Sequence, residues 1–246
     1  GVEQITGICR ENNIPVAFLP GDDQPDAELS GFTSLDGESA HRLWQYCIHG
    51  GTDNALSFLG FAASLIGVDA PWQEPRPLVR AGLYWPGEIT PDLDMLKAHW
   101  QPGRPVAAVV FYRALVQAGN TGVVDALVQG LAGAGLNALP VFTQSLKDPV
   151  AAAILEDVMA AAPPAVILNA TGFAVSAPGA VRSSTPFDES DCPVLQVVFS
   201  GGNETAWREG LTGLGARDIA MNVALPEVDG RIFTRAVSFK GSARRD

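Results

Sequence analysis

Several residue types are scarce in this sequence, and each scarcity excludes a class of function. Cysteine, histidine and lysine each occur only three times among 246 residues. The cysteines form no CxxC pair, so no disulfide framework or cysteine zinc site is predicted, and we expect free thiols in a reducing cytoplasm. The histidines lack HxxxH spacing, so ordinary surface or core histidines are the stronger interpretation and a metal site built from them is the weaker one. The sequence therefore leaves any metal ligands unknown. No lysine follows a glycine, which excludes a GxxxxGK[ST] phosphate loop.

Basic charge and long apolar runs are also lacking. The 16 Lys and Arg residues are outnumbered by 27 Asp and Glu residues, giving a net charge of −11. This balance disfavours nucleic acid as a partner, because phosphate binding needs a basic face. The longest apolar-leaning stretch, residues 55–68, is shorter than a membrane span, and the first residues do not resemble a signal peptide. We therefore expect no nucleic-acid or membrane partner and a cytoplasmic location.

The composition that remains is that of a folded protein, with 47% hydrophobic and 17% charged residues. Residues 1–70 are interpreted as the closing part of an α/β unit, with helices near 3–12, 39–48 and 54–67 and a strand over 14–20. Residues 71–105 are rich in proline, which interrupts regular structure, so we predict a linker or crossing there. A short strand over 78–85 is expected to pass between the units.

Residues 106–246 show the clearest pattern. Apolar runs alternate with amphipathic segments in a βαβ rhythm, which predicts a parallel, doubly wound, flavodoxin-like sheet with right-handed crossovers. The fold class is therefore α/β. The predicted strands are 106–112, 137–142, 165–169, 194–199, 219–223 and 231–239, and the predicted helices are 120–134, 148–161 and 203–214.

Polar residues follow the apolar runs of this second unit. Because parallel strands end at one edge of a sheet, we expect these residues to converge and to bind a polar or anionic ligand there. Arginine can clasp a carboxylate, while amide and hydroxyl groups can hold an anion. A surface ion pair and ordinary turn chemistry remain the alternatives. The candidate substrate-binding residues are Arg113, Asn120, Thr121, Asn169, Thr171 and Ser200.

Two carboxylates lie close together near the end of the chain, in Pro226–Arg231. Glu227 and Asp229 are separated by a single residue and are the candidate catalytic pair. Paired carboxylates can act as acid and base or bind a divalent cation. The alternative is a solvated turn in which Arg231 forms a salt bridge with one of them.

A series of longer motifs, read in order, resembles one protein family. The sequence is similar to the large, tetrapyrrole-binding subunit of aerobic cobaltochelatase, which is related to the porphyrin-binding subunit of magnesium chelatase. The resemblance covers nearly the whole chain and is densest after residue 78. The matching segments are Gly82–Gly87, Val110–Thr121, Leu146–Pro149, Leu168–Ala174, Gln196–Gly202 and Pro226–Arg231.

The resemblance implies ATP-dependent insertion of cobalt, as substrate, into hydrogenobyrinic acid a,c-diamide during cobalamin biosynthesis. It implies a multi-subunit complex in which the large subunit binds the corrin-ring substrate, while AAA+ ATPase subunits use ATP and Mg. Family members are several times longer and carry a His-Phe-Gly-x-His-Gly motif that this sequence lacks. We therefore expect a fragment that needs the remainder of the large subunit and does not catalyse insertion alone, with no cofactor of its own.

Three other interpretations stay open at this point. The chain could belong to a magnesium chelatase-type subunit that binds a porphyrin, because the choice between cobalt and magnesium depends on resemblance alone. It could instead be a non-catalytic α/β ligand-binding module, since the βαβ rhythm and the polar strand ends would be the same. It could also be a structural interface module, which the tryptophans and prolines near residue 85 favour.

Overall fold

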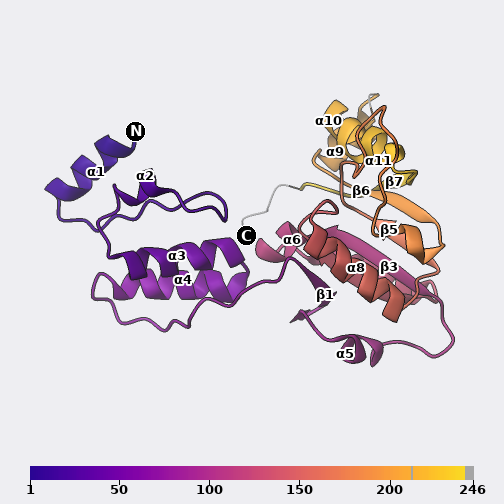
Figure 1. The fold of residues 1–246 in the computed structure, drawn as a ribbon, viewed down its shortest axis with the longest axis horizontal. Coiled ribbons are helices and arrows are strands. Elements are labelled where there is room, and N and C mark those ends of the chain that lie inside the picture. Colours follow the sequence, from indigo (N-terminus) through magenta and orange to yellow (C-terminus); the bar gives the residue numbers. More distant parts are fainter. Residues whose placement is uncertain (212, 242–246) are drawn as a thin grey trace. The chain divides into compact units, whose positions relative to one another are not determined.

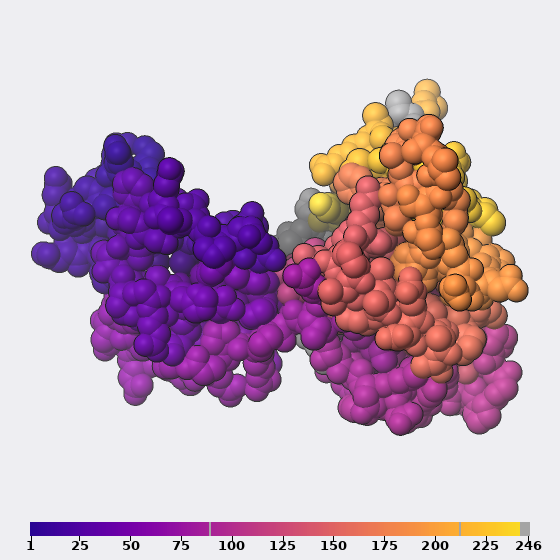
Figure 2. Space-filling view, viewed as in Figure 1, coloured from indigo at the N-terminus to yellow at the C-terminus, as the bar shows by residue number. Residues whose placement is uncertain are grey.

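The chain folds into two compact units. The computed structural model describes residues 1–211 and 213–241. Unit 1 comprises residues 1–78 together with 117–119, and unit 2 comprises residues 79–116 and those from 120 onward (Figure 1). Each unit is a continuous packed body in the space-filling view of Figure 2. Among the described residues, no helix is both long enough and apolar enough to cross a membrane.

Unit 1 is built from helices. Helices α3 and α4 lie side by side (Figure 1) and enclose a small apolar core of Leu43, Tyr46 and Phe61. The side chain of Asp36 caps α3 by accepting a hydrogen bond from the amide of Ser39 at 2.9 Å. The helices of this unit are α1 (Val2–Glu11), α2 (Ala27–Ser30), α3 (Gly37–His49) and α4 (Thr52–Ser64).

The strand predicted over 14–20 is wrong. This segment has no strand partner in the described chain. Instead, the hydroxyl groups of Ser34 and Thr33 accept hydrogen bonds from the amides of Val16 and Phe18, at 2.8 and 3.0 Å. Side-chain hydroxyls thus replace the carbonyl groups that a neighbouring strand would offer. The described elements of unit 1 are therefore all helices, whereas the prediction placed a strand among them.

The proline-rich segment 71–105, predicted as a linker, supplies regular elements to unit 2. Residues 79–105 belong to that unit, and their strands pair antiparallel at one side of its sheet, where prolines are tolerated. Asp92 caps the following helix by accepting a hydrogen bond from the amide of Met95 at 2.7 Å. These elements are β1 (Ala81–Trp85), β2 (Glu88–Ile89) and α5 (Leu93–Lys97).

The sheet of unit 2 has the strand order β2-β1-β4-β3-β5-β6-β7. The last five strands in this order are parallel neighbours. When these five are renumbered from 1 to 5 in chain order, they stand in the order 2-1-3-4-5, which is the flavodoxin-like doubly wound order. The predicted α/β fold is confirmed. The parallel strands are β3 (Val106–Tyr112), β4 (Asn137–Thr143), β5 (Val166–Asn169), β6 (Val194–Ser200) and β7 (Ile232–Phe239).

One core of unit 2 lies between the sheet and α8. Alternate residues of β3, Ala108 and Val110, face Leu155 and Met159 of that helix, and all four are buried. As the sequence predicts, α8 begins after Asp148, whose carboxylate accepts a hydrogen bond from the amide of Ala151 at 2.8 Å. The helices of this part are α6 (Arg113–Gln117), α7 (Gly122–Gly133) and α8 (Pro149–Ala161).

The crossover from β6 to β7 differs from the prediction. The strand expected over 219–223 is helical, and the helix expected over 203–214 ends at Glu209, with residue 212 lying outside the described residues. Asp218 and Met221 lie one helical turn apart. Asp218 contacts Ser200 at the end of β6, and the carbonyl oxygen of Met221 accepts a hydrogen bond from the amide of Phe173 in the loop after β5. The elements are α9 (Glu204–Glu209), α10 (Ala216–Ile219), the π-helical turn η2 (Ala220–Ala224) and α11 (Leu225–Val228), after the 3-10 turn η1 (Asp188–Ser190) that precedes β6.

Candidate functional site

The carboxyl ends of the parallel strands meet at one edge of the sheet, which we call the carboxyl edge. This convergence follows from the parallel register that the sequence predicts. The order of the strands reverses between β3 and β5, and doubly wound folds bind ligands at such a switch point. Tyr112 ends β3 and Ala170 follows β5, and both line a cavity of 730 Å³ at this place.

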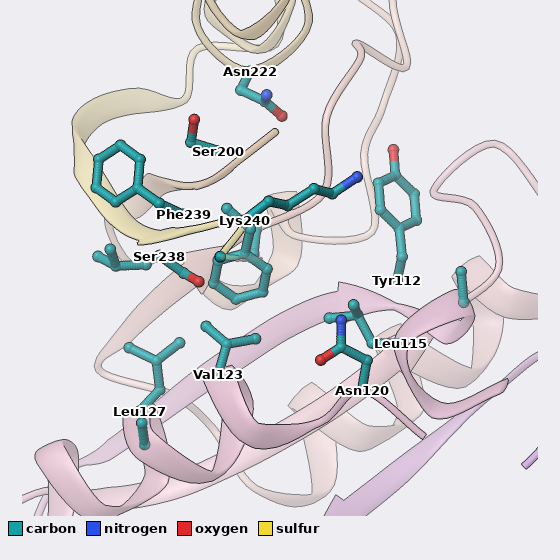
Figure 3. A pocket seen from close by; sticks show the side chains of 16 residues that line it. Tyr112, Leu115, Asn120, Val123, Leu127, Ser200, Asn222, Ser238, Phe239 and Lys240 are labelled. Atoms are coloured by element: carbon teal, nitrogen blue, oxygen red, sulfur yellow. The ribbon is translucent and has the colours of Figure 1, made fainter. Parts of the chain in front are cut away.

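This large cavity is an apolar groove with a polar end (Figure 3). Val123 and Leu127 of α7 form one wall, and Phe199 and Val237 of β6 and β7 lie on the other side. Tyr112, Ser200 and Lys240 stand at or just after the ends of β3, β6 and β7, whereas Ser238 lies beside Val123 and Leu127 (Figure 3). An amphiphilic ligand with an apolar body and polar arms matches this distribution. The polar lining residues are Tyr112, Asn120, Ser200, Asn222, Ser238 and Lys240.

Lys240 lines the groove and is a candidate site residue that the sequence analysis missed. Its side chain extends across the groove, and the ammonium end points toward Tyr112 (Figure 3). The side chain is exposed. A cation in this position attracts a carboxylate. The feature of the sequence that indicates Lys240 is its position directly after the last predicted strand. The predicted residues Asn120 and Ser200 line the same groove, so the structure brings these two together.

Arg113 and Thr121 lie at the carboxyl edge without lining the groove. The Nε of Arg113 donates a hydrogen bond to the carbonyl oxygen of Val79 at 2.9 Å, which ties α6 to the chain before β1. Thr121 stands at the start of α7 beside Tyr84, whose hydroxyl donates to Asp125 at 2.6 Å. Burial, with a smaller effect of the Asp125 hydrogen bond, raises the pKa of Tyr84 to about 12.

Asn169 and Thr171, predicted to bind substrate, are fully buried in a hydrogen-bond network. The Nδ2 of Asn169 donates to the carbonyl oxygen of Thr171 at 3.0 Å and to the Oε1 of Gln196 at 2.8 Å. Its Oδ1 accepts a hydrogen bond from the hydroxyl of Thr171 at 2.9 Å. These groups are occupied by one another, so their role in the structure is to fix the loop after β5.

Ser200 is also held by a neighbouring side chain. Its hydroxyl donates to the Oδ2 of Asp218 at 2.5 Å and accepts from the amide of Gly202 at 3.0 Å. The amide of Gly201 donates to the same carboxylate. Asp218 therefore fixes the turn after β6, and the groove meets a rigid serine rather than a mobile one. The sequence analysis did not identify Asp218, because it placed a strand next to it.

The structure separates the two predicted catalytic carboxylates. Glu227 is exposed on α11, whereas the side chain of Asp229 is fully buried. The carboxylate of Asp229 accepts hydrogen bonds from the amides of Val175 and Ser176, at 2.7 and 2.9 Å, and from Nη2 of Arg231 at 2.8 Å. The predicted alternative, a salt bridge to Arg231, is thus present, but inside the protein rather than in a solvated turn.

The surroundings of Asp229 keep it ionised. Burial raises the pKa of a carboxyl group, but the amides of Ser176 and Val175 and the guanidinium of Arg231 outweigh this effect and hold the pKa of Asp229 below its ordinary value. A carboxylate held in this way is a poor proton acceptor. Only Glu227 of the pair keeps an accessible oxygen. Within the described ranges, no group of three His, Cys, Asp or Glu side chains is placed to hold a metal ion.

Comparison with known proteins supports a single relationship. The chain is 46% identical to the aerobic cobaltochelatase subunit CobN of Sinorhizobium sp. and 44% identical to that of Pseudomonas aeruginosa, in each case over its whole length and 20% of the relative's length. It is 28% identical to a magnesium-chelatase subunit of Rhodobacter capsulatus over 77% of the chain and 17% of that protein. The chain thus spans about a fifth of these relatives.

A solved structure shares the fold. The catalytic subunit of cobaltochelatase from Mycobacterium tuberculosis matches 97% of this chain and 20% of its own, with a TM-score of 0.75 and 24% sequence identity. The sequence pattern of the CobN/Magnesium Chelatase family matches residues 44–246, which is most of the chain. This protein belongs to the CobN/Magnesium Chelatase family.

Proposed function

We propose that this chain is the part of a cobaltochelatase large subunit that holds the tetrapyrrole substrate. The observation that carries the proposal is its much higher identity to two cobaltochelatase subunits, over the whole chain, than to the magnesium-chelatase subunit of Rhodobacter capsulatus. The reaction is insertion of cobalt into hydrogenobyrinic acid a,c-diamide, driven by ATP and Mg on AAA+ partner subunits. The remainder of the large subunit completes the site.

The groove at the carboxyl edge supports a role in binding the macrocycle. Its apolar walls suit the body of a tetrapyrrole, and its polar end suits acidic and amide arms. Lys240 provides a cation for a carboxylate arm, and Asn120 and Ser200 provide hydrogen-bonding groups beside it. In this proposal the segment binds and orients the substrate. A magnesium chelatase-type subunit would use the same groove for a porphyrin, so the ligand must be tested directly.

Filling the groove tests this proposal. Ala126 and Ala132 are both exposed residues of α7, but only Ala126 lines the groove. In the complete large subunit, Ala126→Trp should weaken binding of the corrin substrate by about tenfold or more, because the indole obstructs the groove, a loss of roughly 1.4 kcal/mol. Quenching of intrinsic fluorescence during titration with the corrin and with a porphyrin measures both affinities.

The matched control is Ala132→Trp, which adds the same side chain to the same helix away from the groove and should bind like the wild type. Equal affinity in both variants would remove the groove from the site. Tighter binding of the porphyrin than of the corrin by the wild type would favour the magnesium chelatase interpretation. Failure of the wild type to bind either macrocycle would leave an interface or other ligand-binding module.

Metal insertion also requires a base that accepts the ring N–H protons. Glu227 is the candidate in this segment, because its carboxylate is exposed whereas Asp229 is buried and already bonded. Glu227 does not itself line the groove. In the assembled chelatase, Glu227→Gln should lower the insertion rate by about a hundredfold while leaving substrate affinity unchanged, the size expected for general base catalysis. Absorbance of the metallated product measures the rate. An unchanged rate would exclude Glu227.

A further inference from the structure

The loop after β5 holds an exposed aromatic side chain in a strained conformation. Phe173 has a backbone φ of +62°, a left-handed value that is rare for a bulky side chain and that costs free energy. Phe173 is nevertheless 50% exposed, so burial of its side chain does not account for the conformation. Strain of this kind persists only where the surroundings determine the backbone, and it is common at binding sites.

Three successive carbonyl groups of this loop are fixed by side chains. The carbonyl oxygen of Thr171 accepts hydrogen bonds from Asn169 at 3.0 Å and Gln196 at 2.9 Å. The carbonyl oxygen of Gly172 accepts one from the hydroxyl of Tyr112 at 3.0 Å. The buried network that contains two of the predicted site residues therefore acts on the loop and holds it in place.

A second set of hydrogen bonds holds the loop from its other side. Arg231 donates from Nη1 to the carbonyl oxygen of Phe173 at 3.0 Å, and Asp229 holds the guanidinium by its Nη2. The amide of Phe173 donates to the carbonyl oxygen of Met221 at 2.8 Å. Gly172 packs so closely on residues 221 and 222 that a Cβ would lie 3.0 Å from two of their oxygens. The loop has little freedom to relax its strain.

Phe173 borders a second, smaller cavity at the carboxyl edge. This cavity has a volume of 170 Å³ and is lined by Tyr112, Lys147 and Phe173 among others. Tyr112 also lines the large groove, so the two cavities are neighbours. Lys147 is exposed, and the structure gives its ammonium group no ion-pair partner among the described residues. The small cavity thus combines an apolar ring with a cation.

We propose that Phe173 is a rigidly presented contact for the planar face of the macrocycle, and that the small cavity holds one of its acidic arms against Lys147. This inference rests on the proposed function and names the binding residues of its substrate. An aromatic ring contacts a conjugated ligand over a large area, and a ring fixed in advance loses little conformational entropy on binding. Asn169, Gln196 and Arg231 are positioning residues that act through the loop.

Two substitutions of Phe173 in the complete large subunit separate binding from folding. Phe173→Ala and Phe173→Gly both remove the ring, but only glycine relieves the left-handed backbone. Both variants should bind the corrin substrate about tenfold more weakly, while the glycine variant should have the higher melting temperature of the two. Phe233→Ala, at a 40% exposed phenylalanine of β7, is the control and should keep wild-type affinity.

Lys147 is tested by charge. Compared with the wild type, Lys147→Gln should bind the substrate with free carboxylic acids about fivefold more weakly. It should bind the methyl ester of the substrate as tightly as the wild type does, because the ester has no charge to pair with the lysine. Lys97→Gln removes an exposed lysine of α5 and should change neither affinity. A wild-type protein that binds no macrocycle would overturn the proposed function and this inference together. Wild-type binding with unchanged affinity in both Phe173 variants, or an equal loss for acid and ester in Lys147→Gln, would overturn the inference alone.

Discussion

At the scale of single residues, the polar groups near the carboxyl edge divide into two kinds. Asn120 and Lys240 point into a cavity, whereas Asn169 and Asp229 are buried and bonded to neighbouring groups. Buried polar groups of this second kind must be hydrogen-bonded, because an unpaired one would lose the free energy of its hydration. Their value to the protein is the fixed geometry of the loop that carries Phe173.

The buried pair of Asp229 and Arg231 gives a prediction on stability. Asp229→Asn should lower the free energy of unfolding by about 3–5 kcal/mol at pH 7, because the buried guanidinium loses its counter-charge. Since the folded pKa of Asp229 is lowered, its contribution is fully present above the ordinary carboxyl pKa of about 3.9 and is lost progressively as the pH falls from that value through the lower folded pKa. Denaturant unfolding from pH 7 to pH 3 should show the two proteins converging.

The control for this measurement is an exposed aspartate of the same unit. Asp157 lies on the solvent side of α8, so Asp157→Asn should change the free energy of unfolding by less than about 0.5 kcal/mol. A difference between wild type and Asp229→Asn that stayed constant down to pH 3 would contradict the assignment of the pH dependence to this carboxylate.

At the scale of elements, two helical glycines have opposite surroundings. A Cβ on Gly60 of α4 would lie 2.2 Å from the carbonyl oxygen of Pro71, whereas one on Gly130 of α7 would meet nothing within 4 Å. Gly60→Ala should therefore destabilise unit 1 by about 1–3 kcal/mol through overpacking. Gly130→Ala should stabilise unit 2 by roughly 0.5–1 kcal/mol, since alanine favours the helix.

Thermal unfolding of the two glycine variants beside the wild type measures both effects, and each substitution is the control for the other. Because the chemical change is identical, helix propensity alone predicts stabilisation in both. Opposite signs would show that the close packing of α4 against Pro71 decides the effect of Gly60→Ala. Stabilisation by Gly60→Ala would mean that this contact is loose.

The elements that the sequence predicts well are those with strong periodicity and clear caps. The strands of residues 106–112 and 194–199 and the helix capped by Asp148 are found within a residue of their predicted bounds. The segment 219–223 was predicted as a strand because Ile219 and Val223 favour one. It is helical because contacts with residues distant in sequence outweigh that local preference. Asp218 contacts Ser200 at the end of β6, and Met221 contacts Phe173 in the loop after β5.

The same limit applies to the site. Sequence order and parallel topology are enough to predict that Asn120 and Ser200 lie at one edge of the sheet. They do not predict which polar groups are satisfied by partners far along the chain, as Asn169 is by Gln196 and Asp229 by Arg231. Nor do they predict Phe173, because a left-handed backbone at a non-glycine residue has no local signature.

At the scale of the whole molecule, the chain combines a helical unit with a doubly wound α/β unit. The candidate site lies at the switch point of the sheet, and an antiparallel pair, β1 and β2, completes the other side of the sheet. The proline-rich segment contributes to this arrangement by forming strands at that side rather than a free linker. The fold class and the family can thus be predicted from the sequence. The boundary between the units is instead set by contacts between residues in the folded chain.

β7, one of the two edge strands of the described sheet, has a consequence for association with other molecules. β7 ends the sheet order and exposes Ile232 and Phe233, and such a strand can recruit a strand from another molecule and begin aggregation. Its pairing with β6 is interrupted by register shifts at Gln196/Val197 and Val198/Phe199. Irregularities of this kind increase the local twist and leave a surface on which a straight foreign strand pairs poorly. The distortion of β7 therefore disfavours the pairing of a foreign strand with this edge of the described sheet.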